Sequence, residues 1–493
     1  MKIFLAGYNI DNEVIEELKK NSPPRDDVTP ETLSAAYARI SRDPRPANEL
    51  RALSRQEVRK ARSSNKNIIF KMGHHSVAEH AVFNFDIIGV SRLAIEEIEK
   101  FRLCSYTEKS QRYIKLSEDI VLPEEIKKSG HQDIFLSTVK AQNELYHHLQ
   151  QKLEPYVFHK NKELAEDPKK HTTLKGWAIE DARYIVCLAA EGQLGLTINA
   201  RNLEFMIRRF ASFRLAELGE LNLKIYDLVK DVAPSIILFT EANDFDAKTY
   251  ADLKEKASEL PEVSSPTDDQ AVRLVSFTED PDTKLVSALL HSSTAISYSL
   301  CQQHASRLSS DEKKEIVKTA MQKMEFFDSV LREFEHVDLV FEMVVSATCF
   351  AQFKRHRMAT LTAQNYNPDL GVIIPPSIQN IGAEKDFLDV IERTNEAFIK
   401  LKQKTPLGAN YVLTNAHRRR ILLKVNAREF YHISRLREDT TAQWDIRNVV
   451  RTMSELAINV MPLTCLLIGG KDAYPQIYSD VFGRPPKLKP PEF

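Results

Sequence analysis

The chain has 493 residues, of which 43% are apolar and 28% are charged, a composition typical of soluble globular proteins with two or three domains. Its formal net charge of −1 excludes an overall attraction to nucleic acid or anionic lipid, so an anion site must be a local cluster of arginines. No stretch reaches the roughly 18 apolar residues of a membrane span, and five scattered cysteines without a CxxC pair favour a reducing cytoplasm.

The predicted elements begin with a short apolar strand over residues 2–6. A helix is expected to begin at Thr29-Pro30, because proline suits the first helical position. The alternating pattern of residues 81–88 predicts a strand, as does the segment 272–277, and the apolar run 341–353 is typical of a strand leading into a helix. Apolar residues at i, i+3, i+4 and i+7 predict two amphipathic helices, containing Leu203, Met206, Ile207 and Phe210, and Ile446, Val449, Val450 and Met453.

Several short patterns occur twice in the same order, which indicates a tandem duplication. They are Glu79-His80 and Glu335-His336, Ala182-Arg183-Tyr184 and Ala409-Asn410-Tyr411, Asn199-Ala200-Arg201 and Asn426-Ala427-Arg428, and the opening strands. Helical periodicity dominates both halves, so the expected fold class is α+β with two similar lobes. The expected boundaries are 1–242 for the first lobe, 243–270 for a linker, 271–483 for the second lobe and 484–493 for a proline-rich tail.

One candidate group lies in the first half, where Glu108, Ser110 and Arg112 place an anion, a hydroxyl and a cation close together. Alternate side chains of an extended segment point to one side, so these three suit a nucleoside monophosphate. The alternative is a solvated charged surface. The histidines of His74-His75-x4-His80 do not have the His-Glu-x-x-His spacing, and no metal site is expected.

A second candidate group lies in the second half, where Arg355-His356-Arg357 follows the apolar run. Arginine holds phosphate or carboxylate through paired hydrogen bonds and can lie against a conjugated ring; cations that close a helix are the alternative. Asn426, with Arg428, begins an amphipathic helix, so its amide either caps that helix or reads the edge of a heterocycle. Arg437 follows in the same helix, ahead of Trp444.

In this order, the motifs resemble those of the flavin-dependent thymidylate synthases. That family carries Gly-His-x-Ser-x-x-Glu-His, Arg-His-Arg, Ser-Tyr-Asn-Glu-x-Ser-x-Arg-Tyr, Ala-Arg-Tyr, Asn-Ala-Arg and Leu-Arg-x4-Ala-Gln-Trp-Glu-Ile. The first half supplies Gly73-His74-His75-Ser76-Val77-Ala78-Glu79-His80, residues 105–113, Ala182-Arg183-Tyr184 and Asn199-Ala200-Arg201. The second half supplies Glu335-His336, Arg355-His356-Arg357, Asn426-Ala427-Arg428, Leu436-Arg437 and residues 442–446.

The resemblance implies a fold, an assembly and a reaction. Each lobe is expected to be a curved antiparallel sheet with flanking helices. Because family members are homotetramers, two tandem chains are expected to form a homodimer that mimics the tetramer. The implied reaction converts dUMP to dTMP, with methylenetetrahydrofolate as carbon donor and FAD, reduced by NADPH, as the source of hydride.

The resemblance also implies roles for individual residues. The nucleotide is expected to contact Glu108, Ser110, Gln111, Arg112 and Arg183. Arg437 is expected to lie along the uracil and to stabilise the charge that builds on it. The flavin is expected to contact Arg355, His356, Arg357, Asn426 and Arg428, with His74 nearby.

Each half departs from the family pattern in a different place. Lys100-Phe101-Arg102 replaces Arg-His-Arg in the first half. In the second half Ala363, Asn365 and Asn367 replace Glu, Ser and Arg, and Asn410 stands where Arg183 stands in the first.

The sequence leaves three functional hypotheses. The first is a complementary enzyme, in which nucleotide groups of one lobe and flavin groups of the other make one working pocket per chain. The second is a catalytically silent relative that binds nucleotide or flavin or serves as an assembly partner. The third, an RNA-binding surface made by Lys354 to Arg357 and His417 to Arg420, is disfavoured by the neutral net charge.

Overall fold

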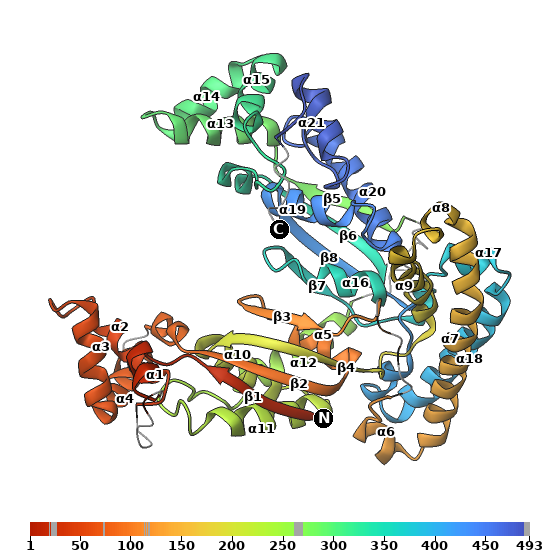
Figure 1. Cartoon of the computed structure of the whole chain (residues 1–493), viewed down its shortest axis with the longest axis horizontal. Coiled ribbons are helices and arrows are strands. Elements are labelled where there is room, and N and C mark those ends of the chain that lie inside the picture. Colours follow the sequence, from red (N-terminus) through yellow and green to blue (C-terminus); the bar gives the residue numbers. More distant parts are fainter. Residues whose placement is uncertain are drawn as a thin grey trace. The chain divides into compact units, whose positions relative to one another are not determined.

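The computed structural model describes residues 1–18, 20, 27–71, 74–112, 114, 116, 119–260 and 270–487. They form two compact units, unit 1 with Met1–Ser264 and Pro375–Thr414, and unit 2 with Ser265–Ile374 and Asn415–Phe493. Each unit contains one four-stranded antiparallel sheet (Figure 1). Among the described residues, no helix is both long and apolar enough to cross a membrane.

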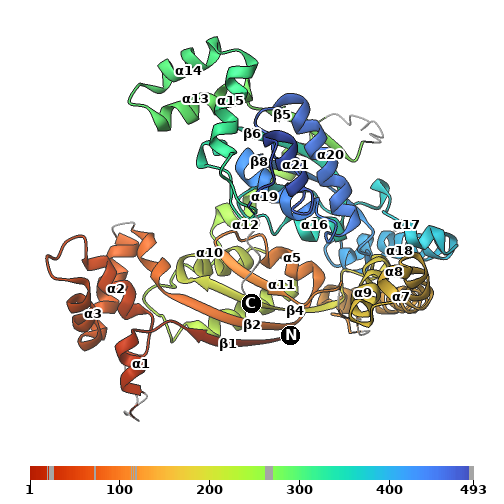
Figure 2. The same cartoon turned by 45° about the horizontal axis from the view of Figure 1, so that its top comes forward.

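The sheet of unit 1 has the strand order β1-β2-β4-β3. Its strands are β1 (Lys2–Tyr8), β2 (Val82–Ser91), β3 (Cys104–Glu108) and β4 (Glu191–Asn199). Alternate residues of β2 are buried, which gives the sheet one face directed into the apolar core. Helix α11 (Ala216–Val229) packs against β1, and α10 (Ala200–Ala211) packs against β4 (Figure 2).

The remaining helices of unit 1 lie before, between and after these strands. They are α1 (Asn12–Leu18), α2 (Glu31–Arg39), α3 (Ala47–Gln56), α4 (Val58–Lys66), α5 (Arg92–Ile98), α6 (Glu124–Ser129), α7 (Gln132–Lys160), α8 (Lys162–Ala165), α9 (His171–Ala182), α12 (Asp244–Ser258), α17 (Pro376–Asn380) and α18 (Glu384–Lys404).

Unit 2 repeats this arrangement, with the strand order β5-β6-β8-β7. Its strands are β5 (Val272–Phe277), β6 (Asp338–Ser346), β7 (Thr360–Ala363) and β8 (Arg418–Asn426). Its helices are α13 (Pro281–Ser293), α14 (Tyr298–Arg307), α15 (Ser310–Met321), α16 (Ala347–Phe353), α19 (Ala427–Arg437), α20 (Trp444–Val460) and α21 (Tyr474–Phe482).

Strand register makes the two sheets equivalent residue by residue. Ser105 pairs with Thr197 in unit 1, and Thr360 pairs with Lys424 in unit 2. Since β4 and β8 end on the equivalent residues Asn199 and Asn426, Ser105 corresponds to Thr360. Lys100-Phe101-Arg102 therefore occupies the place of Arg355-His356-Arg357.

The duplication extends to one buried contact. Ser91 Oγ donates to Glu217 Oε2 at 2.6 Å in unit 1, and Ser346 Oγ donates to Asp445 Oδ2 at 2.6 Å in unit 2. Strand β2 carries one extra residue, Gly89, where the register shifts and φ is +71°. This left-handed backbone suits glycine, and the bulge lets the two repeats keep the same register on either side of it.

The predicted fold class is confirmed: the protein is α+β, with one four-stranded antiparallel sheet in each half and flanking helices. The sheets are open rather than closed. The predicted strands at residues 2–6 and 272–277 are present as β1 and β5. The apolar run 341–353 forms the end of β6 followed by α16, as expected.

The compact units differ from the expected lobes in two segments. Within the expected linker, Asp244–Ser258 is helical, and Asp246 forms ion pairs with Arg208 and Arg209 of α10. Residues 261–269 of that linker and 488–493 of the expected tail lie outside the described residues. The second difference is that Pro375–Thr414, from the second half of the chain, belongs to unit 1.

Helices α7 and α18 explain the placement of Pro375–Thr414, because they lie side by side (Figure 1). The buried amide of Gln142 on α7 donates to Thr394 Oγ1 and to the carbonyl of Val412, both at 2.9 Å. The backbone N–H of Leu188 donates to the carbonyl of Leu413 at 2.7 Å. Tyr411 completes the contact, since its hydroxyl donates to Glu217 Oε2 at 2.7 Å.

Tyr411→Phe should lower the free energy of unfolding of unit 1 by about 1–3 kcal/mol, because it removes a buried donor from the Glu217 carboxylate. Burial raises the pKa of Tyr411 well above its usual value, so the hydroxyl keeps its proton and donates in the native protein. Urea denaturation measures the change. Tyr156→Phe is the matched control, because that hydroxyl accepts from Asn380 at an exposed site and its loss should cost less than about 0.5 kcal/mol. Equal losses in both variants would contradict this account.

Candidate functional site

The first cluster of candidate residues lies in unit 1, where β3 ends at Glu108 and the following turn carries Ser110, Gln111 and Arg112. Glu108 forms an ion pair at 2.5 Å with Arg92 at the start of α5, and both side chains are only 5% exposed. Arg112 forms an ion pair with Glu180 of α9. The backbone N–H of Arg112 donates to Ser110 Oγ at 3.1 Å, which fixes the turn between the two residues.

Arg183 joins this cluster from the turn after α9. It is buried, and burial is the main cause that lowers the pKa of its guanidinium, with Arg112 and Arg92 contributing in the same direction and Glu180 opposing them. We call this group, with Ser110, the anion cluster. The formal charges of its three arginines (Arg92, Arg112 and Arg183) and two glutamates (Glu108 and Glu180) sum to +1. A partly buried group of guanidinium ions with a net positive charge can bind phosphate, which accepts paired hydrogen bonds from arginine.

Every member of this anion cluster is missing at the equivalent positions of unit 2. The counterparts of Arg92 and Glu108 are both alanines, and the counterparts of the other members are uncharged. They are Ala347, Ala363, Asn365, Asn367, Leu407 and Asn410 in place of Arg92, Glu108, Ser110, Arg112, Glu180 and Arg183. Unit 2 therefore has no equivalent anion cluster at these described positions.

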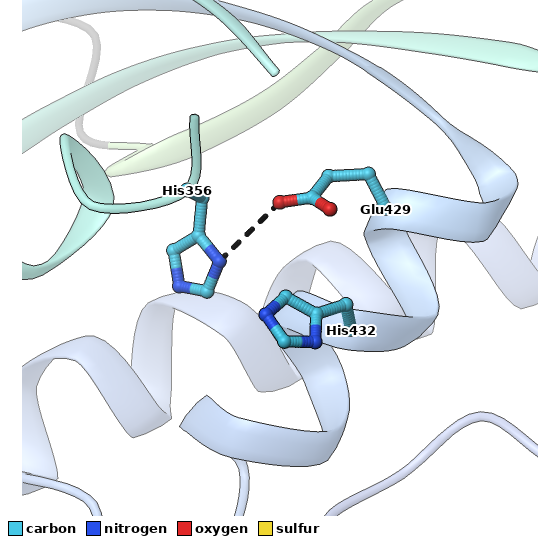
Figure 3. A group of neighbouring side chains, drawn as sticks. All are labelled: His356, Glu429 and His432. Carbon is cyan, nitrogen blue, oxygen red and sulfur yellow. Dashed lines mark ion pairs between the residues drawn. The ribbon is translucent and has the colours of Figure 1, made fainter. Parts of the chain in front are cut away.

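The second cluster lies in unit 2 and centres on His356, which follows α16. Its Nε2 accepts a hydrogen bond from Arg437 Nε at 2.9 Å. Its Nδ1 lies 3.5 Å from Glu429 Oε1, and its ring meets that of His432 edge-on, with centroids 5.6 Å apart (Figure 3). Glu429 and His432 are three residues apart on α19, so both project from one face of that helix.

The hydrogen bond from Arg437 assigns the tautomer of His356. Burial, together with Arg437 and His432, holds the pKa of His356 well below its usual value, so the ring is neutral. Since Nε2 accepts, the single ring proton must be on Nδ1, which faces Glu429. Burial raises the pKa of the Glu429 carboxyl, while His432 and Arg428 oppose this shift.

His356, Glu429 and His432 also satisfy a loose geometric criterion for a metal site, since their ligand atoms lie within 4.8 Å of one another. A metal on Nδ1 would move the ring proton to Nε2, where it would face the N–H of Arg437. The guanidinium charge would also oppose a divalent cation. The chemistry of the donor set therefore disfavours a metal at this place.

The other expected flavin residues have different surroundings. Arg355 is exposed and Arg357 is half-buried, beside Met358, which is 69% exposed. Asn426 caps α19, because its side-chain oxygen accepts from the N–H of Glu429 at 2.9 Å. Arg428 donates to Glu335 at 3.1 Å.

The same cap and the same ion pair occur in unit 1. Asn199 accepts from Asn202 at 3.0 Å, and Arg201 pairs with Glu79. These contacts hold the first turn of the helix in both repeats, so they belong to the fold as well as to the candidate site. His74 is exposed and lies in unit 1, next to Gly73, which is outside the described residues.

Three phenylalanines of unit 1 occupy the places of the polar group in unit 2. Phe101, Phe205 and Phe210 correspond to His356, His432 and Arg437. Phe101 packs edge-on against Phe205 at 5.7 Å and against Phe210 at 5.6 Å. The fold therefore accepts either an apolar or a polar group at these positions, so folding alone does not require the histidines and the arginine.

The basic segment of β8 does not form an open cationic surface. Arg419 is buried between the rings of Phe350 and Tyr366, 4.5 and 4.3 Å from their centroids, and donates to the carbonyl of Gln364. Arg420 lies 3.8 Å from Glu342. These contacts argue against the RNA-binding hypothesis.

Sequence reasoning missed Arg92, Glu180, Glu429 and His432. Arg92 and Glu180 belong to no repeated motif. Glu429 and His432 follow the Asn-Ala-Arg motif, and their spacing on one helical face was the available signal.

Fold and clusters together define a tandem-duplicated α+β protein with an anion cluster in one repeat and an imidazole–guanidinium cluster in the other. Residues 26–235 and 273–463 match the family model described as thymidylate synthase complementing protein. The chain belongs to this family.

Named relatives are of two kinds. A flavin-dependent thymidylate synthase of Clostridium tetani is 31% identical over 215 residues, which are 43% of this chain and 82% of the relative. A UPF0159 protein of Thermoplasma acidophilum is 22% identical over 471 residues, which are 86% of this chain and 91% of the relative. The solved structure of flavin-dependent thymidylate synthase ThyX from Helicobacter pylori, complexed with FAD and dUMP, is 16% identical and covers 49% of this chain and 100% of its own, with a TM-score of 0.32.

Proposed function

We propose that this chain is a flavin-dependent thymidylate synthase with one working site, to which unit 1 contributes the nucleotide-binding residues and unit 2 the flavin- and uracil-binding residues. One observation carries the proposal. The anion cluster is present in unit 1 and is replaced by uncharged residues in unit 2. The imidazole–guanidinium cluster of His356, His432 and Arg437 is present in unit 2 and is replaced by phenylalanines in unit 1. Undirected loss would be expected to remove some groups from both repeats.

The nucleotide side of the proposal rests on the net charge of the anion cluster. Arg112 and Arg183 would hold the phosphate of dUMP, with the Ser110 hydroxyl as a further donor. Gln111 lies between these residues in the same turn. Glu108, held by Arg92, would face a sugar hydroxyl or the base edge. Guanidinium groups and a hydroxyl that lie close together are the donors that suit the phosphate of a nucleoside monophosphate.

The flavin side fits FAD in its donor set. Arg355 and Arg357 would pair with the pyrophosphate, and the exposed Met358 offers apolar surface to a ring. Asn426, Arg428 and His74 remain proposed flavin neighbours. When bound, FAD would supply the redox chemistry, with NADPH as its reductant and methylenetetrahydrofolate as the carbon donor.

Arg437 is the proposed catalytic residue of this chain. Its Nε donates to His356, and in the proposed complex its guanidinium group would lie along the uracil of dUMP. A guanidinium ion there would stabilise negative charge that builds on the base during carbon transfer.

Purified protein should be yellow, with a flavin absorption band, and should oxidise NADPH only when dUMP is added. Spectroscopy with and without dUMP and a stopped-flow assay of NADPH oxidation measure both properties. Protein that takes up no added FAD would contradict the enzyme proposal. Binding of dUMP without flavin would instead favour the second candidate, a silent nucleotide-binding relative, for which the complete anion cluster is the supporting observation.

A further inference from the structure

We propose that Glu429 is a positioning residue for Arg437 and acts through His356. The Glu429 carboxylate lies 3.5 Å from Nδ1 of His356, and by closing to a hydrogen bond it would keep the ring proton on Nδ1. Nε2 is then left to accept the Nε–H of Arg437, which directs the guanidinium group. The role of Arg437 toward substrate rests on the proposed function. The contacts that link Glu429, His356 and Arg437 do not depend on it.

The first support is the geometry around His356. The ring is buried, with 5% of its surface exposed, and Nδ1 makes no hydrogen bond of normal length among the described residues. Glu429 Oε1 lies 3.5 Å away, so a movement of about 0.6 Å would bring the pair to the usual N–H···O distance. An unpaired buried N–H is costly, which favours that closure.

The second support is the direction of the Arg437 side chain. A hydrogen bond from Nε acts close to the branch point of the planar guanidinium group, so it restricts the direction of the whole group. Nε of Arg437 donates to His356 at 2.9 Å, and its Nη2 donates to the carbonyl of Gln352 at 3.4 Å. Of these two hydrogen bonds, the one to His356 has the length of a normal N–H hydrogen bond.

The third support comes from the other repeat. The counterparts of Glu429, His356 and Arg437 are Asn202, Phe101 and Phe210, and none of the three carries a charge. All three positions differ between the repeats, as expected if each side chain is useful only with the other two. The carboxylate, imidazole and guanidinium groups therefore act together, and the fold does not need them for its own packing.

Kinetics of the full-length protein test the positioning role. Glu429→Gln should lower kcat for dUMP-dependent NADPH oxidation by about 10–100-fold and change KM for dUMP less than about threefold, as is typical when a residue that orients an active group is lost. The double variant Glu429→Gln, Arg437→Lys should be no slower than Arg437→Lys alone, because the carboxylate has no effect without its target. Multiplicative losses in the double variant would overturn the proposal.

Asn202→Ala is the matched control, because it changes the equivalent residue at the start of the equivalent helix. It should leave kcat within about twofold of the wild-type value. His356→Gln offers a second check. The glutamine amide oxygen can accept a hydrogen bond from Arg437, but the side chain cannot transmit the effect of Glu429 as the imidazole ring does. Adding Glu429→Gln to His356→Gln should therefore lower kcat no further.

Side-chain ¹⁵N NMR of histidine-labelled protein separates this proposal from the proposed function, because it needs no substrate. The His356 ring, assigned with His356→Gln, should show the neutral tautomer with the proton on Nδ1 in wild-type protein and in Asn202→Ala, and a mixed population in Glu429→Ala. If an inactive protein shows this tautomer pattern, the proposed function is refuted, but the positioning of Arg437 by Glu429 through His356 is still supported. A proton on Nε2, or one equivalent of Zn²⁺ that binds through His356 and is lost in His432→Ala, would overturn the positioning chain whether or not the protein is active.

Discussion

Arg112→Ala should weaken dUMP binding by about 100-fold and leave FAD binding unchanged. In the proposed site the variant would lose charge-assisted hydrogen bonds to phosphate, each contributing about 1.5–3 kcal/mol, where 1.4 kcal/mol corresponds to a tenfold change in affinity. It also leaves the Glu180 carboxylate without its ion-pair partner, so a like charge would then face the phosphate. Isothermal titration calorimetry with dUMP, and flavin fluorescence for FAD, measure the two affinities.

Asn367→Ala is the control for this prediction, because Asn367 is the counterpart of Arg112 in unit 2. It should leave the affinity for dUMP within about twofold of the wild-type value. Arg357→Ala should show the reverse pattern, with weaker FAD binding and unchanged dUMP binding. If a folded Arg112→Ala variant lost both ligands equally, the division of labour between the repeats would be wrong.

Arg437→Ala should lower kcat for dUMP-dependent NADPH oxidation by about 10²–10³-fold, the usual effect of removing a group that stabilises charge in the transition state. The assay follows NADPH absorbance at saturating dUMP and FAD, with circular dichroism to confirm folding. Because the nucleotide would be held mainly by the anion cluster, its binding should change much less than kcat.

Phe210→Leu is the control for this variant, since Phe210 is the counterpart of Arg437 and is fully buried in unit 1. A change from phenylalanine to leucine in a core usually costs about 1 kcal/mol of stability and should leave kcat unchanged. An Arg437→Ala variant that turns over at the wild-type rate would remove Arg437 from the proposed chemistry.

The repeated architecture was predictable from the sequence because each repeat has its own local signals. A short apolar run predicts β1, the alternating pattern predicts β2, and the i, i+3, i+4, i+7 pattern predicts α10 and α20. The order of the repeated motifs fixed which strands and helices are equivalent, and the register of the two sheets agrees with that order.

The assignment of Pro375–Thr414 to unit 1 could not be predicted in this way. It depends on contacts far apart in the chain, such as Gln142 with Thr394 and Tyr411 with Glu217, and local periodicity carries no information about the partner that a helix chooses. The helix α12 was hidden for another reason. Its polar composition is typical of a linker, and its attachment depends on Asp246 pairing with arginines of α10.

The sequence points to candidate residues that belong to a family motif, and it does not point to the residues that contact them from elsewhere. Arg112 and Arg437 stand in such motifs, whereas Arg92 and Glu429 lie outside them. A single sequence does not show that Arg92 meets Glu108, because the pairing depends on β2 and β3 both lying beside β4.

Counting bound ligands tests the central claim most directly. The chain carries two copies of the family fold, and the account predicts one dUMP and one FAD per chain in equilibrium titrations of the full-length protein. Two equivalents of either ligand would mean that each repeat keeps a complete site of its own and would contradict the account.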